Sequence, residues 1–345
     1  MAYTGINKST DYFNTKLYTG NYSTNAITGV GHQPDMVWLK SRSFTQNHEM
    51  YDAVRTATKR IYPNGTYVED TDTAGLTAFN SDGFTLGNSN SSNKNGDTFA
   101  SWNWKAGTGQ GSSNTAGSIN TTYTSVNTNA GFSISSYTGT GSSATIGHSL
   151  GVAPEFIITK SLSLTQDWNV QATALGYSKY LILNGTSAQA NTSGALISSV
   201  SSSTVTVDGN SQVNGSGATY VMYCFASKTG YSKIGSYTGN LNADGTFVYT
   251  GFKPAFVIIK RTDGGTNDWI LYDSKRNING IENALEPNNN NSESTVIGKT
   301  NYNIDLLSNG FKPRSDSDQI NNGSYIYMAF GQSLVGTNNV PCTAR

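Results

Sequence analysis

Three histidines are the first candidates for chemistry in this chain. His32, His48 and His148 show neither the HExxH spacing of a zinc protease nor a second histidine at a metal-ligand interval. His32 and His148 each stand next to a glycine near the start of a repeated phrase. We therefore expect histidines in surface turns at these two positions, without a catalytic or metal-binding role.

Two acidic residues that precede tryptophans form the next candidates. Asp167-Trp168 and Asp268-Trp269 occupy the same place in two copies of a repeat. One interpretation is a sugar platform, in which the indole stacks on a pyranose and the acid binds its hydroxyls. The other is that the tryptophan fills a core and the acid caps a turn. We favour the second, because positions shared between repeats usually record shared architecture.

The remaining short motifs are incomplete. The stretches DTDTAG (70–75) and DSDQIN (316–321) resemble calcium loops only faintly, because both lack the full ligand spacing and a terminal glutamate. There is no G-x-S-x-G nucleophile elbow, and GTGQG (107–111) lacks the lysine of a phosphate loop. The sequence therefore predicts no catalytic residue, no cofactor and no metal ligand, and it identifies no binding residue.

The sequence contains three copies of the segments that would position such residues. Each copy has a Tyr-Thr-Gly, then a phrase of glycine, two residues, proline, a hydrophobic run and a lysine six residues after the proline. Each copy closes on an Asn-Gly turn and an alternating strand. The phrases start at Gly31, Gly151 and Gly251, the lysines are Lys40, Lys160 and Lys260, and the turns are Asn95-Gly96, Asn214-Gly215 and Asn322-Gly323.

The residue patterns of these repeated segments predict β-strands. The run 256–259 has no polar alternation and is rich in β-branched residues, which predicts a strand buried on both faces. Pro254 suits the start of that strand and Gly251 the turn before it. The closing strands alternate, so we expect them to cover a core on one face and to meet solvent on the other. The three lysines should mark where the chain leaves the core, and residues 47–60 should form a strand followed by a loop.

The sequence thus predicts an all-β protein of three tandem antiparallel domains of one repeat family, each a β-sandwich or jelly roll with its own core. The predicted parts are an N-terminal arm (1–11), repeat 1 (12–106), a flexible Gly/Ser/Thr/Asn linker (107–126), repeat 2 (127–230), repeat 3 (231–335) and a C-terminal tail (336–345).

Composition narrows the function. Lys+Arg and Asp+Glu balance at 22 each, so the basic surface of a nucleic-acid-binding protein is not expected. No stretch of about 20 apolar residues and no secretory signal are seen, so we expect neither membrane insertion nor export. Cys224 should be a buried apolar residue, and Cys342 lies in the tail. The 20 tyrosines suit either an adhesive surface or half-buried strands.

Several longer phrases resemble one family. ITGVGHQPDMVWLKSRS, ASWNWKAGTG, AGFSISSYTGTG and the segment from SYTGN to IYMAF are similar to structural proteins of tailed, often marine, bacteriophages. The resemblance extends over about residues 12–332 and implies a virion component without an enzymatic centre, made in the host bacterial cytoplasm.

From the composition and this resemblance we expect a tail or tail-fibre protein that contributes to host-surface attachment. Its expected partners are other virion proteins, itself in a homo-oligomer (a trimer) and a host surface glycan. A capsid decoration protein is the alternative, and a glycan-degrading enzyme with a carboxylate pair about 5–9 Å apart is a third.

Overall fold

The repeated phrase forms the same strand in each third of the chain. These strands are β3 (Met36–Ser41), β13 (Phe156–Ser161) and β22 (Pro254–Arg261). Every residue of β3 and β13 is buried, as predicted for a run without polar alternation. β22 begins at Pro254, and the glycine that opens each phrase has a positive φ, between 74° and 93°. These parts of the prediction are confirmed.

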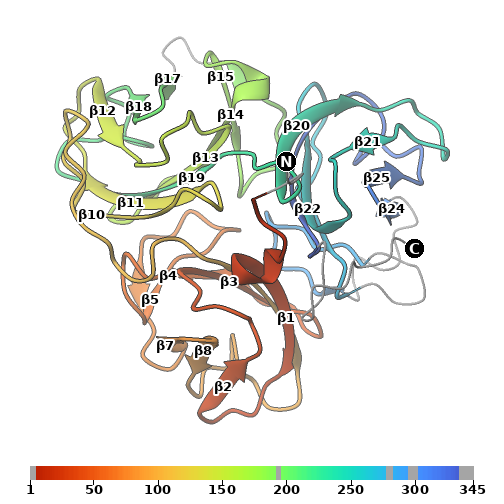
Figure 1. Cartoon of the computed structure of the whole chain (residues 1–345), viewed down its shortest axis with the longest axis horizontal. Helices are drawn as coiled ribbons and strands as arrows, with labels where there is room; N and C mark the ends of the chain where they lie inside the picture. Colours follow the sequence, from red (N-terminus) through yellow and green to blue (C-terminus); the bar gives the residue numbers. More distant parts are fainter. Residues whose placement is uncertain (1–4, 192–195, 277–282, 294–301, 334–345) are drawn as a thin grey trace.

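The computed structural model describes residues 5–191, 196–276, 283–293 and 302–333. Viewed down the shortest axis, the chain makes three lobes around a common centre (Figure 1). Lobe 1 contains β1–β9, lobe 2 contains β10–β19 and lobe 3 contains β20–β26. Apart from two short 3-10 helices, η1 (Ser9–Asp11) and η2 (Thr173–Leu175), the named elements are strands, and the all-β prediction is confirmed.

Each lobe has its own inner sheet. Its four common strands are antiparallel and follow the same order in all three lobes. In lobe 1 they are β1 (Phe13–Thr19), β9 (Thr98–Trp104), β3 and β4 (Glu49–Asp52). In lobe 3 they are β20 (Ser232–Thr238), β26 (Ser324–Gly331), β22 and β23 (Ile270–Asp273). In lobe 2 they are β11 (Phe132–Thr138), β19 (Thr219–Phe225), β13 and β14 (Asn169–Ala172), extended by β10 (Tyr123–Asn127), β15 (Lys179–Ile182) and β16 (Ala190–Asn191).

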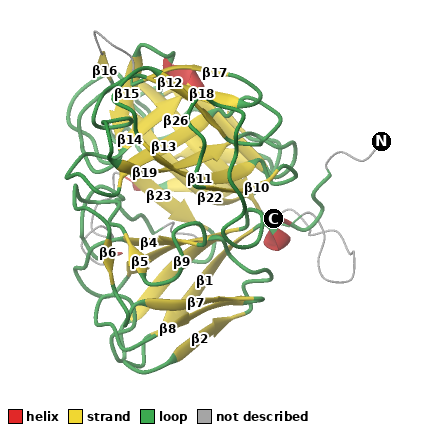
Figure 2. Ribbon diagram, turned by 90° about the vertical axis from the view of Figure 1, so that its left-hand side faces the viewer, coloured by secondary structure: helices red, strands yellow, loops and turns green. Residues whose placement is uncertain are grey.

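A smaller three-stranded sheet covers the outside of each inner sheet. Figure 2 shows the one of lobe 1 far from the other two lobes. These sheets are β2 (Asn25–Thr28), β8 (Gly83–Leu86) and β7 (Leu76–Asn80); β12 (Ala144–Gly147), β18 (Thr204–Val207) and β17 (Ile197–Val200); and β21 (Val248–Tyr249), β25 (Gly310–Pro313) and β24 (Ile304–Leu307). β5 (Lys59–Arg60) and β6 (Asp70–Thr71) form a separate pair in lobe 1.

The central core is shared by all three lobes. Besides an outer core between its two sheets, each lobe sends the inner face of its inner sheet into one common cluster of buried residues. At its middle, Trp104, Phe225 and Phe330 occupy matching positions on the three closing strands and contact one another, with ring centroids 5.7–6.5 Å apart. Each lobe therefore has an outer core of its own, but a shared core joins the three lobes, so the prediction of three tandem domains is not confirmed.

The shared core also corrects the prediction for the closing strands. β9, β19 and β26 are buried on both faces, although one face was expected to meet solvent. Alternate residues pack outward against the small sheet and inward against the neighbouring lobes. In β19, for example, Met222 belongs to the outer core and Tyr223 to the central core.

The segment predicted as a flexible linker is held in place. The buried carboxylate of Asp35 accepts hydrogen bonds from the backbone N–H groups of Ala106, Thr108 and Gly109 at 2.7–3.0 Å. Further on, Ile119 is buried and forms a parallel bridge with Ile146 at the edge of β12. The strand β10 already begins at residue 123. Composition could not reveal these contacts, because their acceptors lie in other parts of the chain.

In each lobe, the tyrosine of the repeated Tyr-Thr-Gly contacts the turn that leads from the small sheet into the closing strand. Tyr18, Tyr137 and Tyr237 donate their hydroxyls to the carbonyls of residues 92, 213 and 320 at 2.5–2.7 Å. The residue after each of these carbonyls is a buried asparagine, namely Asn93, Asn214 and Asn321. The matching turn asparagines are thus 93 and 321 in lobes 1 and 3, not the predicted 95 and 322.

The ends and the cysteines complete the fold. Residues 5–11 of the predicted arm pack on the molecule, with Ile6 in the central core. Cys224 is buried and free, as expected, whereas Cys342 and the tail 336–345 lie outside the described residues. Within the described ranges, no helix has the length and apolar character needed to cross a membrane.

Candidate functional site

The tryptophans of the two acid–tryptophan pairs lie in the core and connect lobes. Trp168 is fully buried, and its indole N–H donates to the carbonyls of Tyr62 and Gly65 in lobe 1 at 2.9 and 3.2 Å. Trp269 donates in the same way to the carbonyl of Ile182 in lobe 2 at 2.8 Å. No indole face is open to a sugar, so the structural interpretation of these pairs is confirmed.

The acidic partners each hold a turn in their own lobe, and these turns supply the carbonyls of Ile182 and Glu286 to the next lobe. Asp167 and Asp268 accept hydrogen bonds from the side-chain amides of Asn184 and Asn288, both at 2.7 Å. The same asparagines accept the backbone N–H of the adjacent tryptophan at 2.8 Å. In lobe 1, His48 takes the tryptophan position and lies 3.2 Å from the carbonyl of Glu286 in lobe 3.

The repeated lysines make a second set of contacts between lobes. Lys40, Lys160 and Lys260 are 0–1% exposed, so the prediction that they mark an exit from the core is wrong. Their Nζ atoms donate to the carbonyls of Asn290, Thr66 and Thr186, each in a neighbouring lobe, at 2.9–3.4 Å. Burial lowers the pKa of Lys40 to about 7 and those of Lys160 and Lys260 to about 8.

These contacts close a ring. Lobe 2 donates to lobe 1, lobe 3 to lobe 2, and lobe 1 to lobe 3. The last junction is reinforced by an ion pair between Arg42 and Glu293. One type of head-to-tail interface, used three times, closes on itself as in a cyclic trimer, but within a single chain.

The three interfaces differ in one matched set of three residues. Asp52 accepts the hydroxyl of Tyr223 at 2.6 Å and pairs with Arg55. Asp273 likewise accepts the indole N–H of Trp102 at 2.9 Å and pairs with Arg276. At the third interface the matching residues are apolar: Ala172, Leu175 and Met328, all members of the central core. Where the charged pair is missing, its polar partner is missing too.

The two histidines predicted to lie in surface turns are buried. His32 is 4% exposed with its Nδ1 2.8 Å from the carbonyl of Thr10, because residues 5–11 cover it. His148 is fully buried between its own loop and the carbonyl of Ser201. Burial lowers the pKa of all three histidines, including His48. In this environment they act as packed, neutral hydrogen-bonding residues.

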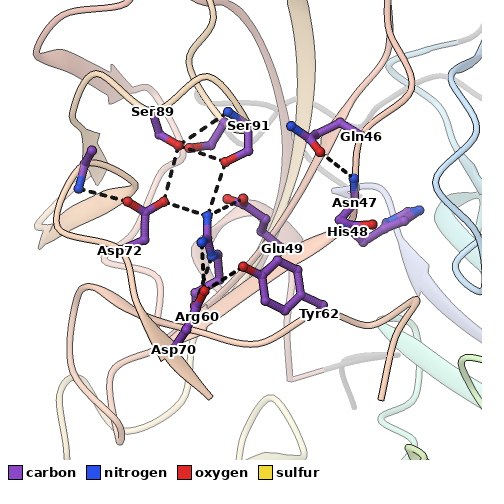
Figure 3. Close-up of polar contacts among 12 residues, drawn as sticks. Gln46, Asn47, His48, Glu49, Arg60, Tyr62, Asp70, Asp72, Ser89 and Ser91 are labelled. Carbon is purple, nitrogen blue, oxygen red and sulfur yellow. Dashed lines mark hydrogen bonds and ion pairs between the residues drawn. The ribbon is translucent and has the colours of Figure 1, made fainter. Parts of the chain in front are cut away.

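The arrangement best suited to binding is a polar pocket on lobe 1 (Figure 3). We call it the Arg60 pocket, after the guanidinium at its centre. It has a volume of about 400 Å³ and is open to solvent. Its lining residues are Gln46, Asn47, Glu49, Arg60, Tyr62, Asp72, Ser89, Asn90 and Ser91. β4 supplies Glu49 and β5 supplies Arg60, so the pairing of Met50 with Ile61 brings the two together.

Arg60 binds three carboxylates. Its Nη1 donates to Glu49 at 2.9 Å and to Asp72 at 2.7 Å, and its Nε and Nη2 donate to the two oxygens of Asp70 at 3.1 and 2.9 Å. The ring of Tyr62 lies under the guanidinium, 4.9 Å from its carbon, and its hydroxyl donates to Asp70 at 2.7 Å. Figure 3 shows Arg60 between these acids.

Burial and charge act against each other in the pocket. Burial raises the pKa of Glu49, and the nearby Arg60 lowers it by less. Asp70, which is more exposed and bound by Arg60 and Tyr62, has a lowered pKa. The pocket thus offers carboxylate, amide, hydroxyl and aromatic groups, which together suit a polyhydroxylated ligand.

The pocket is specific to lobe 1. Strand register matches Glu49 with Asn169 and Ile270, and it matches Arg60 with Tyr180 and Ala284. The other lobes complete the same sandwich without these charges, so the common architecture does not require them. This break in the repeat is the signal by which the sequence could have revealed the site.

Two calcium-like stretches have other roles. Asp70 and Asp72 of DTDTAG belong to the Arg60 pocket. Asp318 of DSDQIN accepts a hydrogen bond from Asn322 and lies 3.4 Å from Arg261. In the described part of the chain, no three His, Cys, Asp or Glu side chains gather as a metal site would require.

Comparison with known proteins finds a family but no curated relative. No curated protein matches the chain. The family described as "Domain of unknown function (DUF7483)" matches residues 8–333, which include all three lobes and the contacts that close the ring. The chain therefore belongs to the DUF7483 family.

Proposed function

We propose that this protein is a structural component of a tailed bacteriophage virion, placed in the tail or a tail fibre, where it contributes to attachment to the host surface. The observation that carries the proposal is the closed ring. Three lobes tied by buried contacts make a compact scaffold that carries loops on its outer surface. Loops positioned by a packed scaffold are typical of binding proteins.

The surface chemistry supports a binding role. Tyr22, Tyr67, Tyr123 and Tyr249 are 36–60% exposed and stand among serine, threonine and asparagine side chains. Many other tyrosines are buried, so the tyrosine excess serves both the core and the surface. Tyrosine with small polar residues is a composition that favours adaptable contacts. The resemblance of the sequence phrases to phage structural proteins supplies the virion context.

Labelling of virions tests the placement. Antibodies against the purified protein, coupled to gold, should label the tail of the phage particle, and added protein should slow adsorption of the phage to its host. Label spread over the head in hundreds of copies would instead support a capsid decoration protein. Light scattering of the purified protein tests the proposed homotrimer, and a monomer at working concentrations would refute that assembly.

A glycan-degrading enzyme is the second candidate, and one observation favours it. Glu49 is buried with a raised pKa, and Asp72 contacts the same Arg60 nitrogen, as an acid and base pair of a glycosidase would have to lie close together. Because Arg60 donates to both carboxylates, the arrangement suits binding better than proton transfer. Release of reducing sugar from host envelope by the purified protein, abolished in Glu49→Gln, would establish the enzyme instead.

A further inference from the structure

We propose that the Arg60 pocket binds a neutral or amine-bearing sugar residue of a cell-surface glycan and rejects acidic sugars. In this arrangement Asp72 accepts hydrogens from the ligand, the buried Glu49 adds negative charge next to it, and Tyr67 stacks on the ring of the ligand. The inference rests on the proposed attachment function and adds the ligand class and the lobe that binds it.

Each nitrogen of Arg60 already donates to an acceptor within the protein. Nε and Nη2 donate to Asp70, and Nη1 is shared among Glu49, Asp72 and the hydroxyl of Ser91, the last at 3.3 Å. An isolated arginine would recruit a carboxylate or phosphate of a ligand through its paired donors. Here Asp70 occupies the Nε and Nη2 edge, and Glu49 and Asp72 occupy Nη1, so an anionic sugar finds no free pair of donors for a two-point contact.

The charge balance of the pocket points the same way. Among the described residues that line it, Arg60 is the one cation, whereas Glu49 and Asp72 line it and Asp70 lies directly behind. Three carboxylates against one guanidinium leave negative charge in excess. This excess repels a sialic or uronic acid and attracts an ammonium group, while Asp72, the more exposed of the two lining carboxylates, binds hydroxyl hydrogens of neutral sugars.

An exposed aromatic ring contacts one edge of the pocket. Tyr67 is 57% exposed and contacts Tyr62 of the pocket edge to face, with ring centroids 5.4 Å apart. Tyr62 itself is held under Arg60. The contact therefore restrains the ring of Tyr67 at the edge of the pocket, while more than half of the residue stays exposed to solvent. A fixed aromatic face beside clustered hydrogen-bonding groups is the combination that binds the apolar face and the hydroxyls of one sugar ring.

The experiment compares three variants on defined glycans. The wild-type protein is applied to an array of neutral, amine-bearing and acidic oligosaccharides, and the best-bound member of each class is titrated by calorimetry. Tyr67→Ala should weaken binding about tenfold, as expected for the loss of one stacked ring. Asn90→Lys, at an exposed position of the rim, should weaken amine-bearing ligands most, because it cancels part of the negative charge.

Tyr249→Ala is the matched control, because Tyr249 is 60% exposed on lobe 3, away from the pocket. It should bind like the wild type. Binding confined to acidic glycans, binding to no member of the array, or equal binding by Tyr67→Ala and Tyr249→Ala would each overturn the inference. Gold label on the tail together with any of these results would leave the attachment function standing and remove only the assigned ligand and site.

Discussion

The interface between lobes 1 and 2 can be rebuilt with residues that the chain itself uses elsewhere. Asp52 and Arg55 are 0% and 3% exposed in their side chains, and Asp52 also accepts the hydroxyl of Tyr223. Asp52→Ala alone leaves Arg55 buried with only Glu69 as an acidic partner, and leaves the tyrosine hydroxyl without its acceptor. Breaking a buried ion pair in this way costs about 3–5 kcal/mol of the free energy of unfolding.

The compensated variant should behave differently. Asp52→Ala with Arg55→Leu and Tyr223→Met copies the apolar set Ala172, Leu175 and Met328 of the interface between lobes 2 and 3. Replacing a buried charged group by apolar residues is often neutral. We expect the triple variant to unfold within about 1 kcal/mol of the wild type, despite carrying the damaging substitution.

Urea unfolding followed by tryptophan fluorescence measures both variants. With a slope of about 3 kcal/mol per M, a loss of 3 kcal/mol moves the midpoint down by about 1 M. A triple variant that is as unstable as Asp52→Ala would refute the claim that the three interfaces are interchangeable solutions to one packing problem.

Three further predictions follow from the ring. Lobe 2 expressed alone as residues 112–230, which include β10, should bind a hydrophobic dye and give poorly dispersed NMR spectra, because Phe156, Ile158 and Phe225 lose their neighbours in the central core. A well-dispersed spectrum would show that one lobe folds by itself. Trp269→Phe should cost about 0.5–1.5 kcal/mol by removing the shorter of two hydrogen bonds to the carbonyl of Ile182, which keeps only the Gly185 N–H at 3.3 Å, measured by urea unfolding against Trp269→Tyr. Stability should rise with pH from about 7 towards 10, because unfolded lysines keep their protons to about 10.4 whereas Lys40, Lys160 and Lys260 release theirs near 7–8. Above about pH 10 it should fall, because burial raises the pKa of Tyr137, Tyr223 and Tyr237 and only the unfolded chain then loses these protons. Urea midpoints at pH 7, 9.5 and 11 test both limbs, and a flat profile would contradict the assignment.

Local sequence signals were sufficient to predict the strands but not to predict what packs against them. Pro254 and the run after it identified β22, and the positive φ of Gly251 was implied by its place before the strand. The same signals could not tell that β9 has a protein surface on both sides, because alternation describes one sheet and not what packs on its far face. Tandem repeats of about 100 residues fit equally well with separate domains and with a ring.

The lysines show the same limit at a single residue. A lysine after a buried run normally leads the chain to solvent, and only the positions of Thr66, Thr186 and Asn290 in neighbouring lobes explain why Lys160, Lys260 and Lys40 stay inside. The Arg60 pocket was within reach of the sequence, since Arg60 and Glu49 depart from the pattern of the other repeats. Finding it required the strand register that aligns the three copies.

The junction of lobes 1 and 3 has a consequence for biosynthesis. Its two sides are about 250 residues apart, as in the contact of Lys40 with Asn290. A ribosome therefore releases the first inner sheet long before its last neighbour exists, and the apolar side of that sheet stays unprotected during most of translation. We therefore expect chains that end before the final strand to expose the apolar side of the first inner sheet and to aggregate unless a chaperone binds them.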